Sequence, residues 1–139
     1  MSLYQDIRGV LQVRAATATG FPSNISYEGV AFTEPTDGSP YARMVMIPAS
    51  GRAFSVDAGT KDHIGLFRVD IFSPSGAGTA TAESLADAVK DVFEPSTRIS
   101  LNGTRVFITY SERTGSIFAD PEWIQVPVTV AWRAFSSNN

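Results

Sequence analysis

Two runs of alternating apolar residues constrain the fold of this chain more than any other feature. The first run, Ile64 to Phe72, places apolar side chains on one face of a strand and charged side chains on the other. The second run, Glu122 to Phe135, alternates in the same way over an even longer stretch. The residues on the apolar faces are Phe67, Val69 and Ile71 in the first run, and Ile124, Val126, Val128, Val130 and Trp132 in the second. Two long strands of this kind predict a sheet that buries one face in a core.

The opposite face of the first run is not purely polar. Leu66 and Phe72 share this face with Arg68 and Asp70. An apolar residue on a strand favours burial. We therefore expect this face to be partly covered, by a neighbouring strand, a helix or another subunit.

Two segments have the spacing of amphipathic helices. The first lies near the N-terminus, with Ser2 as its N-cap and Gly20 and Pro22 beyond its end. Its apolar stripe consists of Leu3, Ile7, Val10 and Leu11, extended by Arg14. The second follows the Ser73 to Gly78 break, is capped by Thr79 or Thr81, and stops at Pro95. Its stripe consists of Leu85, Val89, Val92 and Phe93.

Four shorter segments complete the predicted sheet. Tyr27 to Thr33 and Tyr41 to Ile47 flank a Pro- and Gly-containing turn, which predicts an antiparallel pair. Ile99 to Leu101 and Arg105 to Tyr110 flank Asn102-Gly103, the strongest hairpin signal in the chain. In the last strand, Pro127 cannot donate a ladder hydrogen bond, so we expect that strand to lie at an edge or to carry a bulge there.

The resulting order is α-β-β-β-α-β-β-β. It predicts an α+β fold, a mostly antiparallel sheet with two helices packed on one face. The chain has 139 residues and no cysteine. We expect residues 1–139 to form a single domain, since a chain of this length buries enough surface to fold without disulfides or metal.

Few residues in the sequence could perform catalysis. His63 is the only histidine and there is no cysteine, which argues against a transition-metal site. The Ser75 to Thr79 segment resembles a phosphate-binding turn but has no lysine, so we interpret its glycines as a sharp turn. We therefore predict no enzyme activity, no cofactor and no metal. A small ligand-binding or enzymatic domain using His63 or this turn stays open as an alternative.

The charge pattern also excludes some partners. The net charge is −3, and basic residues are not clustered, so general nucleic-acid binding is not expected. The apolar runs are too short for a membrane span, and the N-terminus does not have the pattern of a signal peptide. Charged residues make up 18% of the chain, which leaves neutral surface that suits contacts with other proteins.

The segment from Ser50 to Asp62 is the least regular part of the chain. Long loops in compact domains are often functional, and apolar residues within one favour a partner contact. The candidate contact residues are Arg52, Phe54, Val56 and Lys61. A hairpin extension whose Phe54 folds back onto the core is an equally good interpretation.

Several of these features together resemble the tail-terminator proteins of long-tailed bacteriophages. The resemblance covers nearly the whole chain and is most specific in the Val-Asp-Ile-Phe strand that ends at Phe72. Other matching features are the helix with Ile7-Arg8 and Leu11, the strand with Val30, Phe32 and Pro35, the segment Pro40 to Arg43, the Gly76 and Gly78 turn, the helix with Ala86-Asp87-Ala88 and Phe93, and Val126-Pro127-Val128. Arg68 departs from the uncharged polar residue expected there, and the loop at 50–62 matches nothing in the pattern.

The resemblance implies a structural role in the virion. Proteins of this kind form a ring, commonly a hexamer of identical subunits, at the head-proximal end of the tail tube. They stop polymerisation of the tail tube protein and join the tail to the neck or connector protein, and DNA passes through the lumen without specific binding. The resemblance places the protein in the neck region of the virion tail, and in the host cytoplasm during assembly. Another head–tail connector protein, a stopper or a head-completion subunit, is the main alternative.

Overall fold

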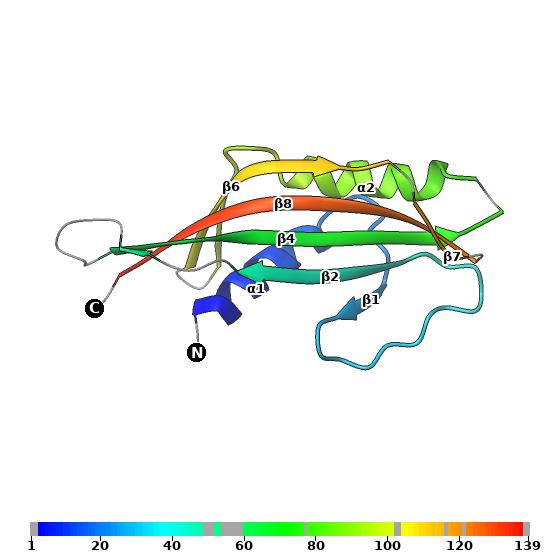
Figure 1. Ribbon diagram of the computed structural model, residues 1–139, viewed down its shortest axis with the longest axis horizontal. Helices are drawn as coiled ribbons and strands as arrows, with labels where there is room; N and C mark the ends of the chain where they lie inside the picture. The colour runs from blue at the N-terminus through cyan, green and yellow to red at the C-terminus, as the bar shows by residue number, and fades with distance from the viewer. Residues whose placement is uncertain are drawn as a thin grey trace.

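The fold is described from a computed structural model (Figure 1). It describes residues 3–48, 52–53, 60–76, 78–101, 104–115, 117–120 and 122–137. Two helices, α1 (Leu3–Ala16) and α2 (Ala80–Val92), lie behind a long twisted sheet in the view of Figure 1. Neither described helix has the length and apolar character needed to span a bilayer.

The centre of the sheet is one antiparallel pair of long strands. Strand β4 (Thr60–Pro74) pairs with β8 (Trp123–Ser137) along the entire length of both, from Thr60 opposite Ser137 to Pro74 opposite Trp123. The two alternating runs of the sequence therefore face each other in register. Because side chains alternate strictly along a strand, this register places both apolar sets on the same face of the sheet.

The remaining strands extend this central pair on both sides. The main order is β1-β2-β4-β8-β6-β5, and the described part of the chain adds two short strands that pair with β4 and β8. The bounds are β1 (Asn24–Tyr27), β2 (Tyr41–Pro48), β3 (Arg52–Ala53), β5 (Arg98–Leu101), β6 (Thr104–Arg113) and β7 (Ile117–Asp120). Without β3 and β7 the order is α-β-β-β-α-β-β-β, so the predicted α+β fold with a mostly antiparallel sheet is confirmed.

Both helices bury their apolar stripes against the same face of the sheet. Ile7, Val10 and Leu11 of α1 are fully buried, as are Val89 of α2 and Phe93 just after it. They pack against the apolar faces of β4 and β8 in one core cluster. The two helices are also tied together at one point, where the Nε of Arg14 donates a 2.8 Å hydrogen bond to the carbonyl of Val92. This bond satisfies a carbonyl at the end of α2 that has no partner within the helix.

The turn that leads into α2 depends on two glycines. Gly76 and Gly78 adopt φ values of 94° and 87°, in the left-handed region that glycine enters at no steric cost. Thr79 is the N-cap of α2, although its side chain makes no capping hydrogen bond. The interpretation of this segment as a sharp strand-to-helix turn is therefore confirmed.

The prediction for the first two strands is wrong in direction and partly in position. β1 covers Asn24–Tyr27 rather than Tyr27 to Thr33, and it runs parallel to β2, with Asn24 opposite Tyr41. A parallel neighbour requires the chain to return along the whole strand before it pairs again. Residues 28–40 make this return, so the turn at Pro35 to Pro40 belongs to a long connection and not to a hairpin.

Pro127 does not lie in an edge strand, contrary to the expectation from its missing N–H. β8 is central, and the described register with β4 has no bulge at Pro127. The carbonyl of Pro127 instead accepts a 3.1 Å hydrogen bond from the backbone N–H of Thr114. The nitrogen and carbonyl of a strand residue point to the same side, so the Pro127 nitrogen faces the gap between the end of β6 at Arg113 and the start of β7 at Ile117. The break between those two strands makes a proline tolerable inside the sheet.

The predicted hairpin near the end of the chain is confirmed. β5 and β6 pair antiparallel, with Leu101 opposite Thr104. The Asn102-Gly103 dipeptide itself lies outside the described residues. β6 then pairs with β8 through a register shift between Ile108 and Tyr110. This bulge changes which β6 residues point away from the helices.

Gly65 provides a test of how tightly the two central strands pack. A Cβ at this position would lie 2.6 Å from Cζ2 of Trp132 and 2.7 Å from the carbonyl oxygen of Ile47. Since neither a buried indole nor a backbone carbonyl can move away easily, we expect Gly65→Ala to lower the free energy of unfolding by about 2–3 kcal/mol. Urea denaturation of the purified variant measures this loss.

Gly9→Ala is the matched control. Gly9 lies in α1, and a Cβ there would have no atom within 4 Å. The same substitution should therefore stabilise the protein slightly, by about 0.5–1 kcal/mol, because glycine is unfavourable within a helix. Equal unfolding free energies for the two variants would contradict the close packing of Trp132 on Gly65.

Candidate functional site

The face of the sheet opposite the helices, which we call the helix-free face, carries a continuous apolar row. Ile47 on β2 lies opposite Leu66 on β4, Leu66 lies opposite Ala131 on β8, and Ala131 lies opposite Tyr110 on β6. These four residues therefore cross four adjacent strands in a straight line. The side chains of Ile47, Leu66 and Tyr110 are 48%, 40% and 46% exposed, which is unusual for large apolar residues aligned in this way.

A hollow lies beside this row. It has a volume of about 380 Å³, and its lining is mostly apolar. Ile64 and Leu66 of β4 line it from one side, and Ala131 and Arg133 of β8 line it from the other. The bulged residue Thr109 closes it and donates a 3.2 Å hydrogen bond to the carbonyl of Ala131. Around this row the helix-free face is therefore apolar and concave, a shape that favours contact with another protein.

Glu112 lies next to the row on β6. Its carboxylate accepts a hydrogen bond from the hydroxyl of Tyr110. This bond raises the pKa of Tyr110 above its ordinary value, because the ionised phenolate would lose the bond and face a like charge. Tyr110 therefore stays protonated at neutral pH, opposite Ala131.

The centre of the helix-free face holds a buried carboxylate between two arginines. The side chain of Asp70 is only 2% exposed. Its Oδ2 accepts a 2.8 Å hydrogen bond from Nη2 of Arg43 on β2, and its Oδ1 accepts one of the same length from Nε of Arg68 on β4. A buried carboxylate is tolerated when both oxygens are hydrogen-bonded to cations. Arg68 therefore has a structural role at the position where the family pattern leads one to expect an uncharged residue.

Aromatic side chains cover the far end of the helix-free face. Tyr41 stacks on Phe72 with ring centroids 4.4 Å apart, and Trp123 meets Tyr41 edge-on at 4.8 Å. Phe32, from the connection between β1 and β2, packs onto this group. This face is partly covered at this end, as expected, but the cover comes from a loop of the same chain and not from a strand, a helix or another subunit. Leu66, at the other end, stays exposed.

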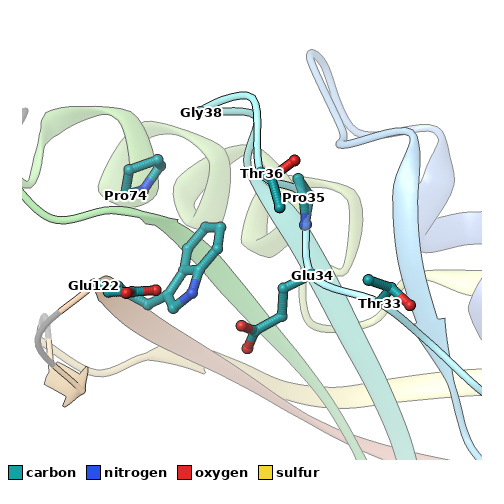
Figure 2. Close-up of a pocket in the computed structure, with 8 residues that line it drawn as sticks. Thr33, Glu34, Pro35, Thr36, Gly38, Pro74 and Glu122 are labelled. Carbon is teal, nitrogen blue, oxygen red and sulfur yellow. The ribbon is translucent and has the colours of Figure 1, made fainter.

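A second hollow borders this aromatic group (Figure 2). Its volume is about 480 Å³, and Glu34 and Glu122 approach it from two different segments. The ring of Trp123 forms part of its wall. Neither His63 nor the glycine turn lines it. The polar groups of the enzymatic alternative therefore do not converge at this hollow.

His63 has a structural environment. It is buried, at 8% exposed, and lies 3.2 Å from the hydroxyl of Tyr4 through Nδ1. The two rings meet edge-on with centroids 5.6 Å apart, so His63 helps to hold α1 against β4. Among the residues whose side chains are described, no three His, Asp or Glu gather as a potential metal site.

The predicted contact loop is only partly described. Arg52 and Lys61 lie in the backbone ladder between β3 and β4, where Arg52 pairs with Asp62 and Ala53 with Lys61. Phe54 and Val56 lie outside the described residues, as do the side chains of Arg52 and Lys61. That these four residues contact a partner therefore stays a prediction.

Only one residue of the exposed row could be recognised from the sequence. Leu66 was recognisable on the charged face of its strand, but Ile47 and Tyr110 were not recognisable as its neighbours. Their alignment depends on the pairing order β2-β4-β8-β6 and on the bulge after Ile108. Both are tertiary features that periodicity along a single strand does not encode.

The buried carboxylate gives a direct test of the helix-free face. We expect Asp70→Asn to lower the free energy of unfolding by about 1–3 kcal/mol, because it removes the negative charge that holds Arg43 and Arg68 together. Asp87→Asn is the matched control, since Asp87 pairs with Arg113 on the surface and such pairs contribute about 0–1 kcal/mol. Urea denaturation compares the two variants. A loss for Asp70→Asn no larger than that of the control would contradict a stabilising role for the Asp70 charge.

Comparison with known proteins gives two informative structures. One solved protein, which carries no descriptive name, is 23% identical with a TM-score of 0.72, and the match covers 96% of each chain. A chain in the virion of a native gene transfer agent particle is 18% identical with a TM-score of 0.56, covering 97% of this chain and 92% of that one. At these identities the likeness shows a shared fold. A search among curated proteins gives no match.

A family model provides the assignment. The model described as phage tail terminator protein matches residues 6–132, which extend from the first turn of α1 to Trp132 in β8. The match includes all or most of every strand of the main sheet and of both helices. The family is one of structural virion proteins, which gives this protein a structural role in the phage tail and a location in the virion. The chain belongs to the phage tail terminator protein family.

Proposed function

We propose that this protein caps the head-proximal end of the phage tail tube, stops tube polymerisation and joins the tail to the neck of the capsid. The observation that carries the proposal is the family match over residues 6–132. The working form is a closed ring of identical subunits, a hexamer, whose partners are the tail tube protein on one side and the neck or connector protein on the other.

The helix-free face supports an assembly role. A subunit in a closed ring needs two different surfaces, because each subunit contacts one neighbour with one patch and the other neighbour with another. Exposed apolar residues aligned across four strands, as at Ile47, Leu66 and Tyr110, are typical of a surface that is buried in an assembly. The exposed apolar row is thus a surface on which the proposed assembly role could depend.

The proposal includes no catalytic step. His63 is engaged with Tyr4, and the two glycines before α2 serve a turn. Asp70, the most buried carboxylate of the described side chains, is hydrogen-bonded to two arginines on strand residues. Each of these groups has a structural function that accounts for its position.

DNA passes through the ring in this proposal without specific binding. A lumen that bound phosphates tightly would oppose passage of the genome, since each phosphate contact adds a salt-dependent attraction. The net charge of −3 suits a subunit that leaves DNA free to move.

Electron microscopy tests the proposed function. The purified protein is imaged alone and after mixing with isolated tail tubes, and tube length is measured after free tube protein is added. We expect rings, extra density at one end of each tube, and no further growth at that end, whereas tubes without the protein continue to grow.

Two outcomes would go against the proposal. If the protein binds isolated capsids with portals in preference to tail tubes, the protein is a stopper or head-completion subunit instead. If it forms no oligomer at any concentration and attaches to neither structure, the capping role is wrong.

A further inference from the structure

The helix-free face and the outer side of α2 carry charges of opposite sign. On the helix-free face, cationic side chains outnumber carboxylates, although the whole chain carries a net charge of −3. Among the described side chains, the charged residues whose strand positions place them on this face are Arg43, Arg68, Arg98, Arg105 and Arg133, against Asp70 and Glu112. Arg43 and Arg68 keep nearly half of their side-chain surface in solvent while they hold Asp70. The apolar row therefore lies among exposed cations.

The outer side of α2 has the complementary character. Its exposed residues are small or acidic and include no large apolar side chain. They are Ala80, Thr81, Ser84, Asp87 and Asp91, with Glu94 just beyond the helix. Lys90 and the Arg113 that pairs with Asp87 offset part of the negative charge. Small side chains let a helix approach a sheet closely, and the remaining acids match the arginines of the helix-free face.

We propose that, in the ring, the helix-free face of each subunit packs against the outer side of α2 of the next subunit. The inference rests on the proposed ring-forming function and names the surfaces that form it. The contact is heterologous, so each subunit uses its sheet toward one neighbour and its helix toward the other. Every sheet in the ring is then covered by helices on both faces.

The size of the surface fits a stable contact. Strands lie about 4.8 Å apart, and side chains on one face repeat about every 6.8 Å, so four rows across four strands span about 500 Å² in projection. Standard interfaces bury about 800 Å² of accessible surface on each partner, and accessible area exceeds projected area. The helix-free face is therefore large enough without the loop at 50–62.

Chemical cross-linking tests the pairing directly, because the chain has no cysteine of its own. Leu66→Cys introduces a thiol on the helix-free face, and Ser84→Cys introduces one on the outer side of α2. These positions lie on opposite sides of the sheet, so a short bis-maleimide cannot join them within one subunit. The two single variants and the double variant are each treated with the reagent, alone in solution and bound to tail tubes.

We expect the double variant to give a ladder of covalent dimers, trimers and larger species up to the ring. The single variants should give no ladder, because in a heterologous contact each thiol faces a surface without one. Dimers from Leu66→Cys alone would mean that two helix-free faces meet, and would overturn the inference. Absence of a ladder from the double variant, both in solution and on tubes, would overturn it as well.

Substitution provides the second measurement. Leu66→Arg adds a cation to the cationic face and removes a central apolar contact, so we expect oligomerisation to weaken by about 30-fold or more in analytical ultracentrifugation. Val13→Arg is the matched control, since Val13 is also an exposed apolar residue, at 56% against 40% for Leu66, and lies on α1. Equal oligomerisation of the two variants would contradict the inference.

The unmodified protein separates this inference from the proposed function. Rings that cap tubes, combined with no cross-linked ladder, would leave the capping role intact and remove only the assigned surfaces. Failure of the unmodified protein to cap tubes or to form rings would remove the function, and the inference with it.

Discussion

The full-length pairing of β4 with β8 is the constraint on which the rest of this structure depends. It joins two segments that are about 60 residues apart in the chain, and it holds them in one register from Thr60 to Pro74. Because a shift of one residue would turn every side chain to the opposite face, this register decides which residues enter the core and which stay outside. Trp132 lying against the bare backbone of Gly65 is one of the contacts that such a shift would destroy.

The same register creates the helix-free face. With the large apolar residues of both strands turned toward α1 and α2, the opposite face receives a mixture of arginines, the carboxylate of Asp70 and a few apolar side chains. Asp70 is buried there because Arg43 from β2 and Arg68 from its own strand cover it. The carboxylate thus links β2 to β4 on the face that no helix stabilises. The apolar row at Leu66 has no such intramolecular cover.

Local patterns in the sequence predict most of this fold but not the strand neighbours. The helix stripes, the two long strands and the β5–β6 hairpin are visible because each depends on periodicity or on one turn dipeptide. The parallel direction of β1 is not visible, because the turn residues at 35–40 look the same in a hairpin and in a long return connection. The prediction of an edge strand at Pro127 fails for a similar reason. The missing N–H shows that the strand has no neighbour to bond with at that nitrogen, but it does not show that the break between β6 and β7 removes that neighbour inside a central strand. The exposed row at Ile47, Leu66 and Tyr110 requires both the strand order and a bulge, so only Leu66 could be suspected.

In a symmetric assembly, an open sheet face can be covered by the same face of another subunit or by a different surface of that subunit. Two helix-free faces packed together would bring the arginines of both subunits near one another, with too few carboxylates between them, and like charges at close range oppose association. Such a contact would also join subunits only in pairs. Both open faces of a pair would then be buried, so no face would remain for a third subunit and no ring could close. Contact with the acidic side of α2 avoids both problems, since it neutralises the arginines and leaves one open face for each further subunit. A cationic sheet face, an acidic outer side of α2 and an uncovered apolar row together favour closure in one direction around a ring.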